Sequence, residues 1–477
     1  MIILGTNSIK DTGFDVANSC RFNGDAYVHK AVSAGNQRTF TYSFWTKRST
    51  LNNYDTFIGY AGTAGGGGGT NRGELIFVGD GDDTLRVGFN PGGSSWSNYT
   101  MNTGVFRDTS AWYNIVLKVN TTSGTEAERL KIFVNGVSQG LSGYPGQNFD
   151  TGFNVNGNVY HVGRSASGTG NFIKGYLAEA VFIDGTALDA DSFGEFDDSG
   201  IWKPIDVSGL TFGTNGFYLD FEDSSNLGND ANGGTDLTEV NLAATDQSTD
   251  TCTNNMPTIN QLTLHSNGVT VSEGNLVATT GDAPWQSTNC TFGLTTGKWY
   301  WEFKATESST NQYLVLGIQS DNLLSSAANG FGYSNNYSYG FKNYNGEFVY
   351  NETDGGGSGS YGNAVTDGQI IGVALDLVNL KIYFSINGTY QNSGNPTSGS
   401  TGTGSPVTLQ SGQTYFPSLV IARAGGTGTI PIGEYNFGSP PYSESGGNSD
   451  GNGYGNFKTA PPSGYYSLNT KNLAEYG

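Results

Sequence analysis

Two pairs of alternating strands, each closed by Asn-Gly, constrain the fold of this chain more than any other feature. The first pair is Trp112–Val119 followed by Leu130–Gly136, and the second runs from Gly368 to Gly388. Apolar residues recur at every second position, as expected for strands with one buried face. Asn-Gly supplies the positive φ angles of a tight turn. Two such copies in one chain predict two antiparallel β-sandwiches in tandem, an all-β fold.

The composition agrees with an all-β protein that has many turns. Glycine accounts for 73 of 477 residues, well above the average share of ~7%. Charged residues make up only 13%, against an average of ~25%. Four tryptophans stand within strong strand sequence and are expected to be largely buried: Trp45, Trp112, Trp299 and Trp301.

Net charge and short apolar segments exclude several classes of protein. The formal charge of −20 provides no basic stripe for a nucleic acid backbone. The first residues are too briefly apolar for a signal peptide, and no apolar run approaches the ~20 residues of a membrane span. Cys20, Cys252 and Cys290 are odd in number and far apart, which disfavours a disulfide framework or a zinc site. We therefore expect synthesis in a reducing cytoplasm, without membrane insertion.

The pattern of strands and turns divides the chain into four parts. Residues 1–222 are predicted to form the first sandwich, and 262–440 the second. Between them, 223–261 lose periodicity and are predicted to be a connector, with an ordered loop at 220–236. The last part, 441–477, is a Gly/Ser-rich tail with a short strand at Tyr465–Leu468.

Five segments of the first region, taken in order, resemble the laminin-G-like, concanavalin A-like jelly rolls. They are Ser19–Gly24, Phe40–Arg48, Ala111–Val116, Lys131–Gly136 and Tyr176–Glu179. The resemblance implies a jelly roll over about 200 residues.

The second region resembles a SPRY domain. The segments that carry this resemblance are Gly297–Glu302, Leu316–Ile318, Ile371–Asp376, Tyr415–Pro417 and Asn436–Gly438. SPRY domains bind different partners through variable loops, so the resemblance implies the fold and leaves the ligand open.

The two modules, followed by the tail Pro461–Thr470, are similar in combination to virion proteins of tailed phages, particularly marine ones. This resemblance implies a fibre, spike or other appendage on head or tail, located in the virion. It implies other virion proteins and a host-surface glycan or receptor as partners. Homo-oligomers, trimers among them, are common in this setting, although the sequence contains no heptad or β-helical repeat.

Catalytic patterns are not found. Gly447–Gly451 matches the G-x-S-x-G elbow, but no strand precedes it and all three histidines lie upstream. Jelly-roll glycosidases need two carboxylates that flank the cleaved bond, and the E-x-D-x-x-E strand arrangement is absent. We therefore assign no catalytic residues and predict a protein that is not an enzyme and requires no cofactor.

Two acidic loops are candidates for calcium, which favours carboxylate and carbonyl oxygens on flexible loops. Laminin-G-like domains often bind this ion, as the resemblance implies. The candidate ligands are Asp80, Asp82 and Asp83 in one loop, and Asp220, Glu222, Asp223 and Asp230 in the other. Solvated acidic turns are the alternative interpretation.

Aromatic residues in uncharged loops suit glycan recognition, because sugar rings stack on aromatic faces while Asn and Asp bind hydroxyls. The candidates are Trp96 and Tyr99 in the first region, and Tyr333, Tyr337, Tyr339 and Tyr344 in the second. Packing against the edge of a sandwich is the alternative. The denser set lies in the second module, which we expect to carry recognition while the first docks to the particle.

The sequence therefore predicts a non-enzymatic phage structural protein that displays loops for host-surface recognition. One alternative is a purely architectural capsid or tail decoration subunit. Another is a jelly-roll enzyme that degrades polysaccharides.

Overall fold

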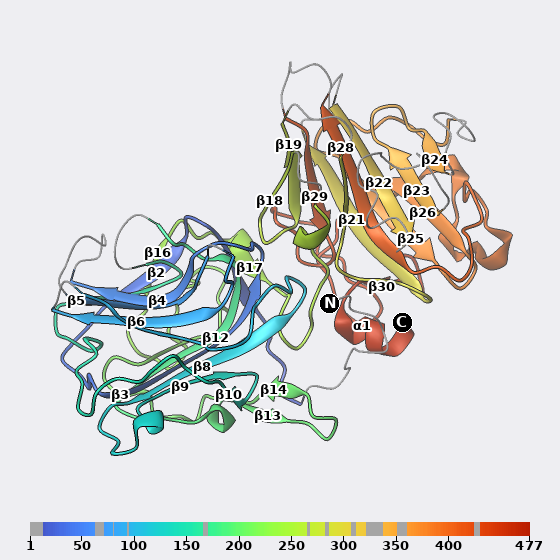
Figure 1. Ribbon diagram of the computed structural model, residues 1–477. Helices are drawn as coiled ribbons and strands as arrows, with labels where there is room; N and C mark the ends of the chain where they lie inside the picture. The colour runs from blue at the N-terminus through green and yellow to red at the C-terminus, as the bar shows by residue number, and fades with distance from the viewer. Residues whose placement is uncertain are drawn as a thin grey trace. The chain divides into compact units, whose positions relative to one another are not determined.

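The chain forms two β-sandwich modules. The computed structural model describes residues 13–62, 71–79, 81–92, 95–165, 170–264, 268–281, 286–306, 312–320, 337–350, 360–423 and 430–477. The boundary between the two compact units lies between Thr253 and Asn254 (Figure 1). We call the unit that ends at Thr253 the first module, and the one that follows it the second module. The all-β prediction is confirmed.

Two sheets face each other in the first module. The eight-stranded sheet has the order β10 (Val137–Ser138), β9 (Leu130–Val134), β8 (Trp112–Asn120), β3 (Thr39–Arg48), β12 (Lys174–Asp184), β1 (Ser19–Asn23) and β17 (Gln247–Ser248), and β15 (Phe217–Leu219) also pairs with β12. The seven-stranded sheet has the order β16 (Thr238–Val240), β2 (Tyr27–Ala31), β11 (Val159–Val162), β4 (Asp55–Ala61), β5 (Asn71–Phe77), β6 (Leu85–Pro91) and β7 (Ser97–Thr100). A separate hairpin joins β13 (Gly194–Phe196) to β14 (Trp202–Pro204).

Aromatic rings fill the space between these two sheets. Phe44 and Phe57 stack with centroids 4.5 Å apart, and Phe40 stacks on Phe153 at 4.6 Å. All four side chains are buried in one cluster. Each fully buried ring of this size contributes roughly 1.5–3 kcal/mol relative to exposure, so this cluster stabilises the packing of the two sheets.

Both Asn-Gly turns have the predicted conformation. Asn135 and Gly136 adopt φ angles of 46° and 77°, and Asn387 and Gly388 adopt 46° and 84°. Each turn begins a further two-residue strand, β10 in the first module and β27 in the second. The strand faces are also as predicted: Ile132 packs in the first core, and Ile382 and Phe384 pack in the second.

The second module is also a sandwich of two sheets (Figure 1). Its eight-stranded sheet has the order β18 (Val269–Ser272), β19 (Val277–Thr280), β29 (Ile432–Asn436), β21 (Lys298–Thr306), β25 (Ile370–Asp376), β26 (Lys381–Ile386) and β27 (Thr389–Tyr390), and β30 (Tyr466–Ser467) also pairs with β21. The five-stranded sheet has the order β20 (Gln286–Asn289), β28 (Tyr415–Arg423), β22 (Gln312–Ser320), β23 (Ser338–Lys342) and β24 (Phe348–Tyr350).

Short helical turns connect the strands. The described residues contain one α-helix, α1 (Thr470–Tyr476). The 3₁₀ turns are η2 (Glu126–Glu128), η3 (Ala190–Ser192), η4 (Ala244–Asp246), η5 (Gln261–Thr263), η7 (Gln391–Ser393) and η8 (Pro396–Thr401). The four predicted tryptophans are buried, with Trp299 and Trp301 fully enclosed.

The segment 223–261 differs from the predicted connector. Its β16 pairs with β2 and its β17 pairs with β1, so most of it completes the two sheets of the first module. The residues after Asn254 belong to the second module, where Ile259 forms a bridge with Cys290. These two short strands, Thr-Glu-Val and Gln-Ser, lack the apolar alternation on which the boundary prediction depended.

The segment 441–477 packs closely on the second module. Its β30 pairs in parallel with β21, where Trp299 lies opposite Tyr466. Leu468 and Leu473 enter the core. The predicted strand at 465–468 is present, whereas α1 was not expected.

Glu302 on β21 holds this segment in place. Its buried carboxylate accepts hydrogen bonds from the backbone N–H groups of Lys458 and Thr459, at 2.8 and 2.9 Å. The hydroxyl of Tyr300 and the amide of Asn436 also donate to it, at 3.0 and 3.3 Å. Burial raises the pKa of Glu302, and the donors Lys458, Thr459 and Tyr300 oppose that shift by favouring the anion.

We expect Glu302→Gln to destabilise the second module. Glutamine can accept only through one oxygen, and its amide would face N–H groups that need an acceptor, at a cost of about 2 kcal/mol or more. Urea unfolding should show the loss, and limited proteolysis should release 441–477 faster. Glu475→Gln, at an exposed position in α1, is the matched control and should leave both unchanged. Equal protease resistance of the two variants would contradict the role of Glu302.

Candidate functional site

A row of side chains crosses the outer face of the seven-stranded sheet of the first module. Residues directly opposite each other in neighbouring strands share a face. The row, from β16 to β7, is Thr238, His29, His161, Gly59, Glu74, Gly88 and Asn98. Core residues such as Leu75 and Val87 alternate with these positions and point the other way. We call this face, together with Arg72, Arg86 and Trp96, the outer-face site.

Glu74 lies at the centre of the outer-face site and is 6% exposed. Its carboxylate accepts a hydrogen bond from the Ser165 hydroxyl at 2.7 Å and lies 3.9 Å from a guanidinium nitrogen of Arg86. Burial raises the pKa of Glu74, while Ser165, Arg86 and Arg72 oppose the shift. Two arginines therefore lie close enough to act on one carboxylate.

Trp96 lies at the edge of this face, just before β7. The guanidinium carbon of Arg72 is 5.2 Å from the centre of the indole, a cation–π contact. A Cβ at Gly88 would lie 2.8 Å from the Trp96 ring and 2.7 Å from the Asn98 amide oxygen. Glycine at this position is what lets both side chains lie across β6. The indole is partly exposed, and Asn98 is exposed.

The other end of the row is aromatic and basic. The rings of His29 and His161 are 6.1 Å apart, and Tyr27 lies 5.9 and 5.8 Å from them. The guanidinium group of Arg164 lies 4.6 Å from the centre of the Tyr27 ring. Burial and the charge of Arg164 lower the pKa of His29, so its neutral form is favoured. The outer-face site thus offers rings, cations and amides for binding.

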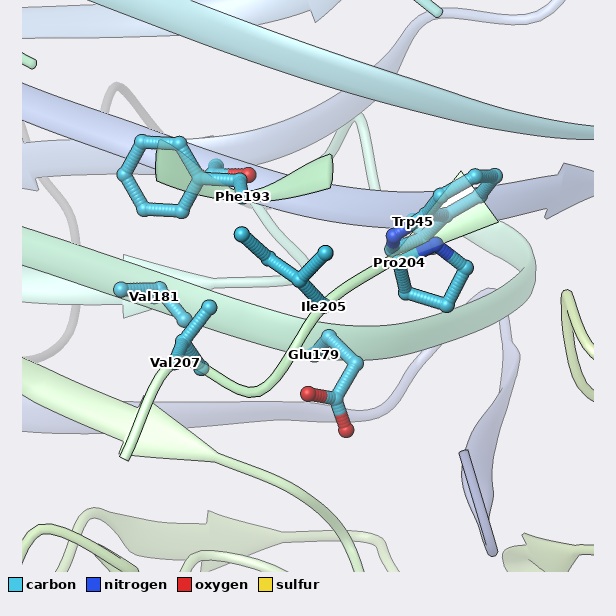
Figure 2. Close-up of a pocket in the computed structure, with 8 residues that line it drawn as sticks. Trp45, Glu179, Val181, Phe193, Pro204, Ile205 and Val207 are labelled. Atoms are coloured by element: carbon cyan, nitrogen blue, oxygen red, sulfur yellow. The ribbon is translucent and has the colours of Figure 1, made fainter. Parts of the chain in front are cut away.

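A small hollow lies on the other sheet of the first module. It is lined by Ser43, Trp45, Glu179, Val181, Phe193, Pro204, Ile205 and Val207. Figure 2 shows Ile205 in the middle of these residues, with the carboxyl group of Glu179 directed away from Phe193. Only Glu179 among them carries a charged group, so the hollow is largely apolar.

The backbone at Glu179 is unusual. The register of β12 with β3 shifts between Ala178 and Val181, and Glu179 in this bulge has a φ of 50°. The Tyr218 hydroxyl donates to the Glu179 carboxylate at 2.6 Å. Burial raises the pKa of Glu179 to about 8, and the negative charges of Asp220, Glu222 and Asp206 act in the same direction. Burial and the negative neighbours together keep this carboxyl group protonated near neutral pH, at a position where the backbone is strained.

The structure separates the two candidate aromatics of the first module. Trp96 lies on the outer face, as described above. Tyr99 lies opposite Val87 on the other face of β7, and its ring is 6.1 Å from the core residue Phe89. Strand alternation therefore turns these two candidates to opposite faces of β7, and Tyr99 packs at the edge of the sandwich, the alternative interpretation given above.

The candidate aromatic residues of the second module also differ in how far they are buried. Tyr339 is 2% exposed and its hydroxyl accepts from the backbone of Gln410, so its proposed ligand contact is wrong. Tyr337 packs partly against the core. Tyr344 is half-buried, with Tyr313 at 4.7 Å and the Lys342 ammonium at 5.9 Å. Tyr333 lies outside the described residues.

Two candidate ligands of the first acidic loop, Asp82 and Asp83, lie within the described residues. Asp83 is buried and forms ion pairs with Arg48 at 3.0 Å and Arg107 at 3.1 Å. Burial alone would raise its pKa, but the backbone N–H of Asn52 and the guanidinium of Arg48 outweigh this and lower it. Asp82 is exposed, and Asp80 lies outside the described residues. The oxygens of Asp83 are therefore already occupied by cations.

Carboxylates of the second acidic loop accept hydrogen bonds from nearby backbone N–H groups. Those of Asp220 and Asp223 accept from the backbone two residues further on, at Glu222 and Ser225. Asp230 is buried, accepts from the backbone of Tyr218 and lies 3.4 Å from Lys30. Across the described ranges, no three acidic, His or Cys side chains form a group that could hold a metal. The carboxylates of Asp83 and Asp230 thus both have protein partners.

Sequence reasoning missed Arg72, Glu74, Arg86 and Glu179. The signal for the first three was present in the sequence. Arg72 and Glu74 occupy alternate positions just before the core residue Leu75, and Arg86 and Gly88 flank the core residue Val87. Charged residues at alternate positions of apolar strands mark the solvent face. For Glu179 no signal predicts a bulge at this position.

Comparisons with known proteins assign both modules. Residues 22–192 match the family described as Concanavalin A-like lectin/glucanases superfamily. Residues 298–407 match the SPRY domain family. The chain carries a concanavalin A-like domain followed by a SPRY domain. Both domain assignments made from sequence are thereby confirmed, and the outer-face site belongs to the concanavalin A-like domain.

Three solved structures show distant similarity to parts of this chain or to most of it. The SPRY domain of human HERC1 is 13% identical and covers 37% of this chain and 96% of its own, with a TM-score of 0.27. Domains LG4-5 of the mouse laminin alpha1 chain are 9% identical and cover 90% of both chains, with a TM-score of 0.30. A heptameric SAP-like pentraxin from Limulus polyphemus is 16% identical and covers 37% of this chain and 80% of its own, with a TM-score of 0.28.

A search of curated proteins found no match. Among the helices of the described residues, none has the length and apolar character needed to cross a membrane.

We expect Glu179 to make the concanavalin A-like domain less stable as pH rises. Its pKa is about 8 in the folded domain against an ordinary 4.5, so between these values the folded state keeps a proton that the unfolded state releases. Stability should fall by about 3 kcal/mol between pH 5 and pH 8 through this group. Urea unfolding across this range should show a shallower dependence for Glu179→Gln.

Other buried carboxyls, such as Asp55 with a pKa of about 6, titrate in both proteins and cancel in the difference. The exposed Glu126→Gln is the matched control and should keep the wild-type dependence. Identical pH profiles for wild type and Glu179→Gln would show that Glu179 is ionised in the folded domain.

Proposed function

We propose that the chain is a non-enzymatic recognition protein whose concanavalin A-like domain binds saccharides at the outer-face site. The observation that carries the proposal is the partly exposed indole of Trp96, held against Gly88 and beside Arg72. An indole face accepts the apolar face of a sugar ring, while neighbouring amide and guanidinium groups hydrogen-bond to its hydroxyls. Asn98 supplies an exposed amide next to the ring.

The family to which the first domain is matched includes lectins and glucanases, and the proposal favours lectin activity. A glycosidase needs two carboxyl groups on either side of the bond that is cleaved. At the outer-face site one carboxylate, Glu74, is buried against Ser165 and Arg86. Its neighbours in the row are the glycines Gly59 and Gly88, so these positions supply no second acid.

The sequence assigned recognition to the second module, whereas the described geometry favours the first. Tyr339 is buried, and Tyr337 and Tyr344 pack against other side chains. Much of the predicted recognition surface at 331–345 and 351–361 lies outside the described residues. Tyr344→Ala therefore serves as the comparison variant for Trp96→Ala.

We also propose that the protein works as a virion appendage of a tailed phage, assembled with other virion proteins and with copies of itself. The support is the order of the two modules and the tail 461–470, which together resemble such proteins. Calcium at an acidic loop remains part of this proposal, with Asp82, Asp220, Glu222 and Asp223 as its accessible carboxylates. Immunogold labelling of purified particles would locate the chain.

We expect Trp96→Ala to lower binding to oligosaccharides on a printed array about tenfold or more, as stacking worth 1–2 kcal/mol is removed. Gly88→Ala should also weaken binding, because its Cβ would displace the indole. Neither change touches the core, so the melting temperature should stay within a few degrees. If Trp96→Ala bound oligosaccharides as well as wild type while Tyr344→Ala lost binding, the binding site would have to lie in the SPRY domain.

We expect no sustained release of reducing ends when the full chain is incubated with any polysaccharide that it binds. A single buried glutamate beside an arginine can contribute to binding of a saccharide. It cannot supply both the general acid and the general base that hydrolysis requires. Turnover abolished by Glu74→Gln or by Glu179→Gln would reassign the protein as a glycosidase.

A further inference from the structure

We propose that the outer-face site selects acidic saccharides, with Arg72 and Arg86 as the residues that bind the carboxylate or sulfate group. The inference rests on the proposed function, because it names the class of saccharide for the same site. A neutral sugar would need only the indole and the amides for binding, so the presence of the arginines favours a ligand that also carries an acidic group.

The sheet register places the two arginines on either side of Glu74. Arg72 lies opposite Asn90, and Arg86 lies opposite Ile76, while Glu74 between them lies opposite Gly88. All three charged side chains project from the same face, because they occupy alternate positions of β5 and β6. The arginines are therefore held by rigid strands rather than by loops.

The local charge is opposite to that of the whole chain. The chain has 42 acidic and 22 basic residues, yet this face brings Arg72 and Arg86 to a single carboxylate. A third arginine, Arg164, lies on the same face beside Tyr27. Within the described ranges Arg72 forms no ion pair, and Arg86 reaches Glu74 only at 3.9 Å. At this site Arg72 and Arg86 share one carboxylate, that of Glu74.

One hydrogen-bond donor of each of these two arginines is also unused. The Nε–H groups of Arg72 and Arg86 are shielded from water and find no acceptor among the residues that the structure describes. A buried donor without an acceptor costs free energy, which a bound oxyanion would recover. Guanidinium groups bind carboxylate and sulfate oxygens through two parallel N–H groups, one of which is Nε–H.

The position of Trp96 connects the two parts of the ligand. The guanidinium carbon of Arg72 is 5.2 Å from the centre of the indole. That separation is short enough for one sugar residue to stack on the ring while its acidic substituent reaches Arg72. A polymer of phosphodiesters carries its charge between its sugars rather than on a sugar ring, so it lacks this combination.

Binding of the full-length protein to matched polymers tests the proposal. Dextran sulfate against dextran, and polygalacturonate against its methyl ester, differ only in the acidic group. We expect the acidic member of at least one pair to bind at least tenfold more tightly, with affinity falling as salt is raised. The pair that responds distinguishes sulfate from carboxylate. Equal binding of the acidic and neutral members in both pairs would overturn the inference and leave saccharide binding intact.

Four variants separate ligand binding from a structural role of the arginines. Arg72→Gln and Arg86→Gln should each lower affinity for the acidic polymer about tenfold, while affinity for neutral polymers changes little. Glu74→Gln should raise it several-fold, because the competing carboxylate is removed. Arg38→Gln is the matched control, since it loses the same charge from an exposed ion pair with Asp150, and it should bind as wild type.

If the arginines served only to neutralise Glu74, Glu74→Gln would not strengthen binding and Arg72→Gln would leave it unchanged. Should Arg72→Gln fail to fold, Arg72→Lys keeps the charge but loses the paired N–H groups, and it should weaken binding at a native melting temperature. Polyadenylate is included as a polymer without acidic sugars. Polyadenylate binding as tight as that of the acidic polysaccharide would identify a general polyanion site and overturn the inference. No binding to any polysaccharide, with Trp96→Ala without effect, would instead remove the proposed function.

Discussion

In both modules the same pair of hydrogen bonds joins the Asn of the Asn-Gly turn to the neighbouring strand. In the first, the side-chain oxygen of Asn135 accepts from the backbone N–H of Asn114 at 2.8 Å, and its own N–H donates to the Asn114 carbonyl at 2.9 Å. In the second, Asn387 makes the equivalent bonds with Ile370, at 3.0 and 2.8 Å. Asparagine meets both demands here, because it tolerates a positive φ and carries an acceptor. The register set by these bonds determines which side chains enter each core.

The alternation that builds the core also builds the outer-face site. Once Leu75 and Val87 point inward, Glu74, Arg86 and Gly88 must point outward, and the register places Glu74 opposite Gly88. The glycine then provides the space in which Trp96 lies across β6. A binding surface on strands is more rigid than one on loops, so little ordering entropy opposes ligand binding.

Much of the fold could be predicted because apolar alternation and Asn-Gly turns are local signals. The strands β3, β8, β9, β21, β25 and β26 carry strong alternation, and their predicted positions agree with the structure. The short strands β16 and β17 are polar and depend on partners far away in the chain, so local patterns could not place them. The helix α1 is likewise stabilised by its packing, through Leu473 in the core.

The candidate site could be predicted only in part. An aromatic residue in a polar loop indicated Trp96, but the same rule selected Tyr339, which a strand carries into the core. The acidic loop at Asp83 looked like a metal site because its counter-ion, Arg48, lies 35 residues away in the sequence. Pairing between strands, rather than composition, decides which charges meet.

The position of β30 has a consequence for synthesis on the ribosome. The last strand of the first module is β17, so that module has all its strands once Gln247–Ser248 have left the exit tunnel. In the second module, one edge of the start of β21 has no partner until Tyr466–Ser467 emerge. The bonds from Lys458 and Thr459 to Glu302 likewise form only after those two residues have emerged. Vectorial folding would therefore proceed module by module, and slow translation of the 3′ part of the message would prolong the exposure of an unfinished SPRY sheet.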